Sequence, residues 1–169
     1  MNEFQKLWWE QARSDHEILS LLRENGAGPC HQLHYLQMVT EKLAKAYFWG
    51  AKSPPKNKSH AGFGQFMRAL ASFQGSKLDQ LAMSLGFKSV KAFETWIRDV
   101  HPLVYALERL APALAQDGPN PEYPWPHDSP ADNPVRHQFE VWVQLTETWQ
   151  GRRLIKAIGP AVERFPSYA

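Results

Sequence analysis

The histidines and the acidic residues near them are the side chains of this sequence that could bind a metal ion or carry a proton. His31 and His34 are three residues apart, so a helix would place them on one face. A catalytic zinc or iron site needs at least a third ligand and usually a carboxylate. Glu41 on the same helix, with Asp15 or His60 from neighbouring helices, would have to complete it. No His-Glu-x-x-His motif is present, and we predict no metal site and no cofactor.

Other common catalytic motifs are missing from the sequence. There is no Gly-x-Ser-x-Gly elbow for a nucleophilic serine. Cys30 is the only cysteine, which excludes an internal disulfide, and a lone cysteine at a helix start is more often a small half-buried residue than a nucleophile. The run Ala61-Gly62-Phe63-Gly64 lacks the last glycine and the preceding strand of a dinucleotide-binding loop. We therefore predict no catalytic residue from these motifs.

The composition is that of an ordinary globular protein. Of the 169 residues, 43% are apolar and 21% are charged, which argues against a disordered or collagen-like chain. The longest apolar runs fall far short of the roughly 20 residues of a membrane helix. The charged residues Glu3, Lys6 and Glu10 interrupt the first apolar stripe, whereas a signal segment has an uninterrupted apolar stretch. We expect one domain over residues 1–169, located in the cytoplasm and outside membranes.

The net charge of +2 hides two segments of opposite sign. Residues 40–60 contain five lysines and one glutamate, whereas residues 117–134 contain four acidic residues and no lysine or arginine. A basic segment of this size could attract phosphate, but dedicated nucleic-acid binders usually carry larger arrays. The alternative, a solvated loop with lysines on its surface, is favoured.

Hydrophobic spacing of three and four residues predicts helices along most of the chain. They cover residues 3–25, 30–50, 59–73, 76–85, 89–110 and 139–165, with a kink or a break expected near Pro102 and breaks near Gly151 and Gly159-Pro160. Residues 112–134 contain seven of the 13 prolines and show no helical spacing. No segment alternates convincingly with a period of two. The sequence therefore predicts an all-α fold with a long proline-rich loop.

The second predicted helix carries the most characteristic motif, in the run His34-Tyr35-Leu36-Gln37-Met38-Val39-Thr40-Glu41-Lys42-Leu43-Ala44-Lys45-Ala46. This run resembles the second helix of HEPN domains, the nucleotide-binding-associated helical domains of higher eukaryotes and prokaryotes. That family typically shows Glu-Lys-x-x-Lys-Ala in its second helix. Its first helix typically carries an inward-facing acidic residue, and Asp15 fits that position. Ser59-His60 matches a histidine that often opens the third helix, and Tyr123-Pro124 is similar to a pair that often precedes the last one.

The resemblance covers residues 3–73 best and implies an up-down helical bundle, to which this chain adds C-terminal helices and a proline-rich loop over residues 117–134. It further implies a homodimer, and a partner that is a nucleotidyltransferase-like protein, a nucleotide or RNA, in a toxin–antitoxin or defence system. Members that cleave RNA carry an arginine, four to six residues and then a histidine. Here Arg98 and His101 are too close and Arg23 and His31 too far apart.

The expected function is therefore that of a non-catalytic binding or interaction module. The alternative is a metal-independent ribonuclease with an atypical site, such as His60 with Lys45 and His34. The residues predicted to form the binding site are Asp15, His34, Glu41, Lys42, Lys45 and His60.

Three structural expectations accompany this interpretation. Asp15 lies on an apolar stripe, so its carboxylate should point into the bundle and pair with His34, Glu41 or Lys42. The seven tryptophans and nine phenylalanines exceed what a small bundle readily buries, which predicts an apolar patch at a two-fold interface. Residues 117–134 should pack across the bundle through Tyr123 and Trp125, with their acidic side chains against residues 40–60.

Overall fold

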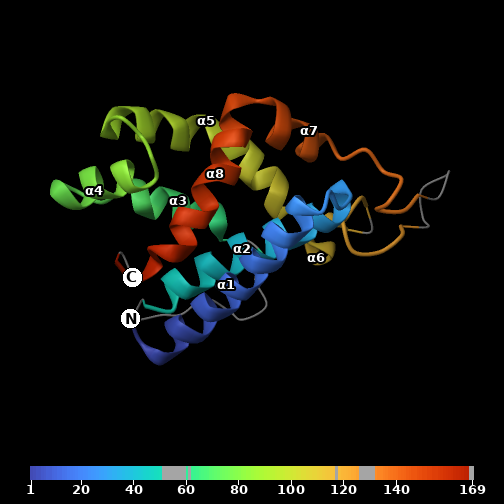
Figure 1. The fold of residues 1–169 in the computed structure, drawn as a ribbon, viewed down its shortest axis with the longest axis horizontal. Helices are drawn as coiled ribbons and strands as arrows, with labels where there is room; N and C mark the ends of the chain where they lie inside the picture. Colours follow the sequence, from blue (N-terminus) through green and yellow to red (C-terminus); the bar gives the residue numbers. More distant parts are fainter. Residues whose placement is uncertain (51–59, 61, 117, 126–131, 168–169) are drawn as a thin grey trace.

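The computed structural model describes residues 1–50, 60, 62–116, 118–125 and 132–167 (Figure 1). Its helices are α1 (Glu3–Glu24), α2 (Pro29–Phe48), α3 (Phe63–Ala71), α4 (Ser76–Ser84), α5 (Val90–Glu108), α6 (Pro112–Ala115), α7 (Glu140–Glu147) and α8 (Trp149–Glu163), followed by a 3₁₀ turn at Phe165–Ser167. An isolated bridge between Trp125 and Asp132 is the one β pairing in these ranges. The predicted all-α fold class is confirmed. None of the described helices combines the length and apolarity needed to cross a membrane.

Helices α1 and α2 form an antiparallel hairpin (Figure 1). Asn2 begins α1 with a capping box, in which its side chain accepts a hydrogen bond from the Gln5 backbone and the Gln5 side chain accepts one from the Asn2 backbone. Gly26 follows the helix with a φ of +66°, a conformation that favours glycine, and Pro29 starts α2. These local signals explain why the predicted bounds of both helices are confirmed to within two residues.

The start of α3 differs from the sequence-based prediction. The helix begins at Phe63, whereas a start at Ser59 was expected, and Ser59 lies outside the described residues. The carboxylate of Glu108, from α5, accepts hydrogen bonds from the backbone N–H groups of Gly62 and Gly64 at 2.8 and 3.0 Å. A buried side chain from a distant helix therefore caps α3, a role that a local serine was expected to fill.

The breaks expected at Pro102, as an alternative to a kink, and at Gly159-Pro160 are absent. Helix α5 continues through Pro102 and α8 continues through Gly159-Pro160. An interior proline costs about 3 kcal/mol, but buried residues on both sides of Pro102, such as Val100 and Leu103, hold α5 in the core. The separation of α7 from α8 falls at Thr148, whose hydroxyl accepts a hydrogen bond from the Gly151 backbone. Packing thus overrides the helix-breaking tendency of proline in this chain.

The proline-rich segment packs on the bundle in its described parts. Trp125 is only 3% exposed and its ring lies against those of His137 and Phe139, so its predicted burial is confirmed. Tyr123 is 52% exposed, so its predicted burial is wrong. A tyrosine keeps a polar hydroxyl that water satisfies, which makes burial less necessary than for a larger indole.

The two described acidic side chains of this segment, Glu122 and Asp132, have partners other than the described lysines of residues 40–60. Glu122 faces His34, and Asp132 accepts a hydrogen bond from the Asn133 backbone and lies 2.9 Å from His137. The Asn133 hydrogen bond, followed by the His137 contact, lowers the pKa of the Asp132 carboxyl from its ordinary value. Residues 51–59, 117 and 126–131, with the remaining charges, lie outside the described residues. The predicted match between the two charged segments stays a prediction there.

Candidate functional site

Most of the polar residues predicted to form a site lie where α2 meets α1 and His60. Helix α2 is buried along much of its length, and its buried residues include Glu41 and Lys45 among apolar side chains. Charged groups taken out of water are strongly unfavourable unless they are paired and hydrogen-bonded. The ion pairs of this polar cluster, which comprises Asp15, Glu41, Lys42, Lys45 and His60, meet that requirement.

Asp15 and Lys42 connect α1 to α2. The Lys42 Nζ lies 2.5 Å from one Asp15 carboxylate oxygen, and the Gln11 side chain donates a hydrogen bond to the other at 3.0 Å. The Asp15 side chain is 10% exposed and the Lys42 side chain is 15% exposed. The prediction that Asp15 points inward and pairs with a polar residue of the second helix is confirmed, and Lys42 is the partner among the three that were expected.

Glu41 holds the second part of the cluster together. One of its carboxylate oxygens accepts a hydrogen bond from Lys45 Nζ at 2.6 Å. The other lies 3.0 Å from Nδ1 of His60 and accepts a hydrogen bond from Gln37 at 3.4 Å. The spacing of four residues within α2 brings Gln37 and Lys45 one turn to either side of Glu41. The helix geometry therefore aims two polar side chains at one buried carboxylate, and His60, which lies outside α2, adds a third.

His60 is the most accessible member of the cluster. Its side chain is 35% exposed, compared with 8% for Glu41 and 9% for Lys45. With Nδ1 directed at the Glu41 carboxylate, Nε2 makes no hydrogen bond to any of the described residues. A histidine held in this way through one ring nitrogen can exchange a proton or a hydrogen bond with a ligand through the other.

His34, in contrast, lies apart from the cluster. It is two turns before Glu41 on α2, and its Nδ1 is 3.5 Å from the Glu122 carboxylate without forming a hydrogen bond. His31, His34, Pro121, Glu122 and Tyr123 line a shallow open pocket of about 330 Å³. Within the described residues, no group of three or more histidine, cysteine, aspartate or glutamate side chains is placed to hold a metal ion.

Two residues near the cluster were missed by sequence reasoning. The Trp8 ring, from α1, lies 4.8 Å from Lys45 Nζ and forms a cation–π contact with it. Gln11 supplies the second hydrogen bond to Asp15. Trp8 stands seven residues before Asp15 on the stripe of α1 that faces α2, and Gln11 stands four before it. This helical spacing was the signal that could have identified both.

Comparisons with protein-family models, curated proteins and solved structures give no match for this chain.

Proposed function

We propose that this chain is a HEPN-like helical module that acts by binding a partner and has no catalytic activity of its own. The observation that carries the proposal is the mutual pairing of the motif residues. Asp15 with Lys42, and Glu41 with Lys45, form ion pairs whose side chains are all 15% exposed or less. Groups that are neutralised by each other and shielded from water cannot easily reach a substrate.

The polar cluster then serves to fix the register of α1 against α2. A buried ion pair adds little net stability compared with a well-packed apolar pair, but a wrong register would leave each charge unpaired at a large cost. Fixing this hairpin also fixes the outer face of α1 and the position of His60. The cluster therefore supports binding surfaces beside it and need not itself be the contact surface.

The exposed apolar face of α1 is the proposed surface for a second copy of the chain. Phe4, Leu7, Ile18 and Leu21 are 38–55% exposed and, with Gln11 and Ser14 between them, follow steps of three and four residues. Such a stripe is typical of a helix that packs against another helix. A homodimer through this face would place two α1–α2 hairpins side by side, leaving His60 for a nucleotidyltransferase-like protein, a nucleotide or RNA.

Leu7→Glu combined with Leu21→Glu is expected to convert the protein from dimer to monomer. Each charge would have to be desolvated in the proposed interface, which is strongly unfavourable. Light scattering coupled to size-exclusion chromatography over a range of concentrations measures the mass. Met83→Glu, on an exposed residue of α4, is the matched control and should leave the dimer intact. A monomeric wild-type protein at the highest concentration would refute the proposed homodimer.

A second candidate function, metal-independent cleavage of RNA, is favoured by the Glu41–His60 contact alone. A carboxylate that orients a histidine through one ring nitrogen is a common arrangement for a general base. His60 could take the proton of a ribose 2′-hydroxyl as its oxygen attacks phosphorus. The departing 5′-oxygen also needs a proton, which His34 or Lys45 would have to supply. His34 is distant from the cluster, and Lys45 is buried within it.

Incubation of RNA with the purified protein in the presence of a chelator distinguishes the two functions. We expect no cleavage, and the same result for His60→Gln, because none of the described residues beside His60 is an accessible second proton carrier. Cleavage by the wild-type protein that is lost in His60→Gln but kept in His31→Gln would overturn the binding proposal in favour of the ribonuclease. His31 is exposed and makes no contact with the cluster, which makes it the appropriate control.

A further inference from the structure

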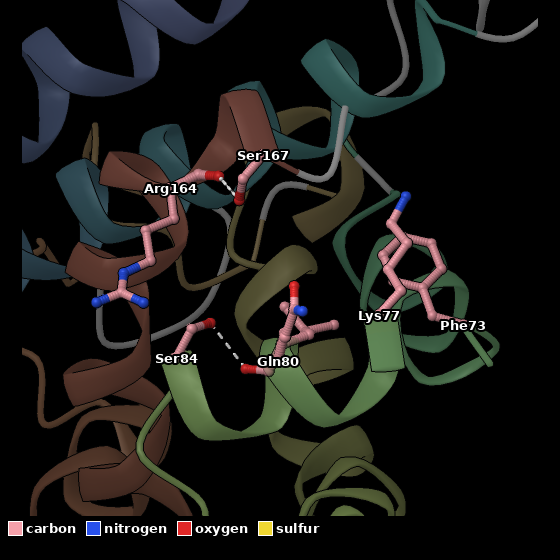
Figure 2. A pocket seen from close by; sticks show the side chains of 7 residues that line it. Phe73, Lys77, Gln80, Ser84, Arg164 and Ser167 are labelled. Atoms are coloured by element: carbon pink, nitrogen blue, oxygen red, sulfur yellow. Dashed lines mark hydrogen bonds between the residues drawn. The ribbon is translucent and has the colours of Figure 1, made fainter. Parts of the chain in front are cut away.

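A pocket lies between α4 and the C-terminal end of α8, and Figure 2 shows it from close by. Its volume is about 150 Å³, and no residue of the cluster lines it. It is bounded by an aromatic ring, two cations, an amide and two hydroxyls, from Phe73, Lys77, Gln80, Ser84, Arg164 and Ser167. Figure 2 shows Gln80 between Arg164, which lies toward Ser84, and Lys77, which lies beside Phe73.

The two cations of the pocket lack an acidic partner. No acidic side chain lines the pocket, and neither Lys77 nor Arg164 forms an ion pair with any described residue. The Lys77 ammonium instead lies 4.2 Å from the centre of the Phe73 ring. Two positive charges beside one concave surface raise the local concentration of anions. The planar guanidinium of Arg164 can bind two oxygens of a phosphoryl group at once.

The hydroxyls of the pocket present hydrogen-bond acceptors. Ser84 donates to the Leu81 carbonyl at 2.8 Å, and Ser167 donates to the Arg164 carbonyl at 2.7 Å, as Figure 2 shows. Their lone pairs therefore remain for donors on a ligand. The Gln80 amide, which has no hydrogen bond to a described side chain or backbone group, can donate and accept. This arrangement suits an anion that also carries hydroxyl groups.

Two apolar side chains also line the pocket. Phe73 is half-buried, and Leu81, which also lines the pocket, is 4% exposed. Aromatic and aliphatic surface of this kind packs well against the C–H face of a sugar ring. Cations, hydroxyl acceptors and apolar surface together match the phosphoryl group, the hydroxyls and the ring face of one molecule.

We propose that the α4–α8 pocket binds a sugar phosphate, with the phosphoryl group on Arg164 and the sugar hydroxyls on Ser84 and Ser167, while Lys77 adds positive charge from the other side of Gln80. A free sugar monophosphate and the terminal phosphorylated nucleotide of a nucleic-acid strand share this chemistry. The inference rests on the pocket alone and does not depend on the proposed function, since none of its residues belongs to the polar cluster or to the exposed face of α1.

Titration of the ¹⁵N-labelled protein with ribose 5-phosphate, followed by NMR, tests the proposal. We expect saturable shifts of the backbone signals of α4 and of the end of α8. Arg164→Gln should weaken binding about tenfold, because it removes a charge-assisted hydrogen bond, whereas Lys77→Gln should weaken it less, because only a more distant positive charge is lost. Lys91→Gln and Lys156→Gln remove one exposed charge from α5 and α8 outside the pocket and should change the affinity by less than about twofold.

Further probes separate the parts of the proposal. Inorganic phosphate and unphosphorylated ribose should each bind more weakly than ribose 5-phosphate, and equal affinity for phosphate would overturn the role of the hydroxyls. A 5′-phosphorylated oligonucleotide that binds through the same signals, more tightly than the free sugar phosphate, would identify a strand end as the source. Absence of saturable shifts, or equal losses in the Lys156→Gln control, would overturn the pocket as a site.

Discussion

Asp15→Ala is expected to lower the free energy of unfolding by about 3 kcal/mol. The substitution leaves the Lys42 ammonium, whose side chain is 15% exposed, without its carboxylate partner at the α1–α2 interface. It also removes the acceptor of the Gln11 side-chain hydrogen bond. Chemical denaturation monitored by circular dichroism measures the change. The effect should appear as a lower midpoint, with the slope of the transition unchanged.

The same helix offers a matched control for this prediction. Glu10 forms an ion pair with Lys6, but the two side chains are 48% and 60% exposed. Glu10→Ala should therefore cost no more than about 0.5 kcal/mol. The double variant Asp15→Leu and Lys42→Met, which replaces both charges, should recover much of the lost stability. Equal costs for Asp15→Ala and Glu10→Ala would contradict the buried pairing on which the polar cluster depends.

Gly151→Ala is expected to destabilise the protein by about 3 kcal/mol. Gly151 lies in the first turn of α8, where the chain turns back from α7. A β-carbon at this position would overlap the carbonyl oxygen of Gln144 and lie 2.5 Å from the α-carbon of Leu145, both of them backbone atoms of α7. The backbone cannot rotate away as a side chain can, so the two helices would have to separate.

Gly159→Ala, in the same helix, controls for the general effect of this substitution. Its β-carbon would meet only the His16 side chain, at 3.4 Å. The gain in helix propensity of up to about 1 kcal/mol should offset that close contact. Thermal denaturation of the two variants measures the difference. A midpoint for Gly151→Ala equal to that of Gly159→Ala would show that α7 and α8 pack less closely than described.

The hairpin of α1 and α2 was predictable because its signals are local. The capping residue Asn2, the turn at Gly26 and the proline at the start of α2 lie within a few residues of the positions they determine. The inward direction of Asp15 also followed from helical spacing alone. Its partner did not, since His34, Glu41 and Lys42 all lay within the range of registers that the sequence allowed.

The start of α3 and the continuity of α5 were not predictable, for a related reason. Gly62 and Gly64 receive their cap from Glu108, and Pro102 stays helical because its neighbours are buried in the core. Both outcomes depend on contacts between residues far apart in the chain. Propensity describes one residue and its immediate neighbours, whereas such contacts contribute free energies of similar or larger size.

The sequence by itself determined the all-α fold class, the buried face of the second helix and the residues that had to be paired if buried. It did not determine the face of the first helix, because Phe4, Leu7 and Ile18 of its apolar stripe are exposed. The tertiary structure decided which of these residues meet: it joins His60 to Glu41, separates His34 from them, and brings Lys77 and Arg164 to one pocket. The physical reason is the distance along the chain over which each kind of interaction acts. Helix formation follows from hydrogen bonds and spacing within one turn, but the meeting of charges depends on how whole helices pack.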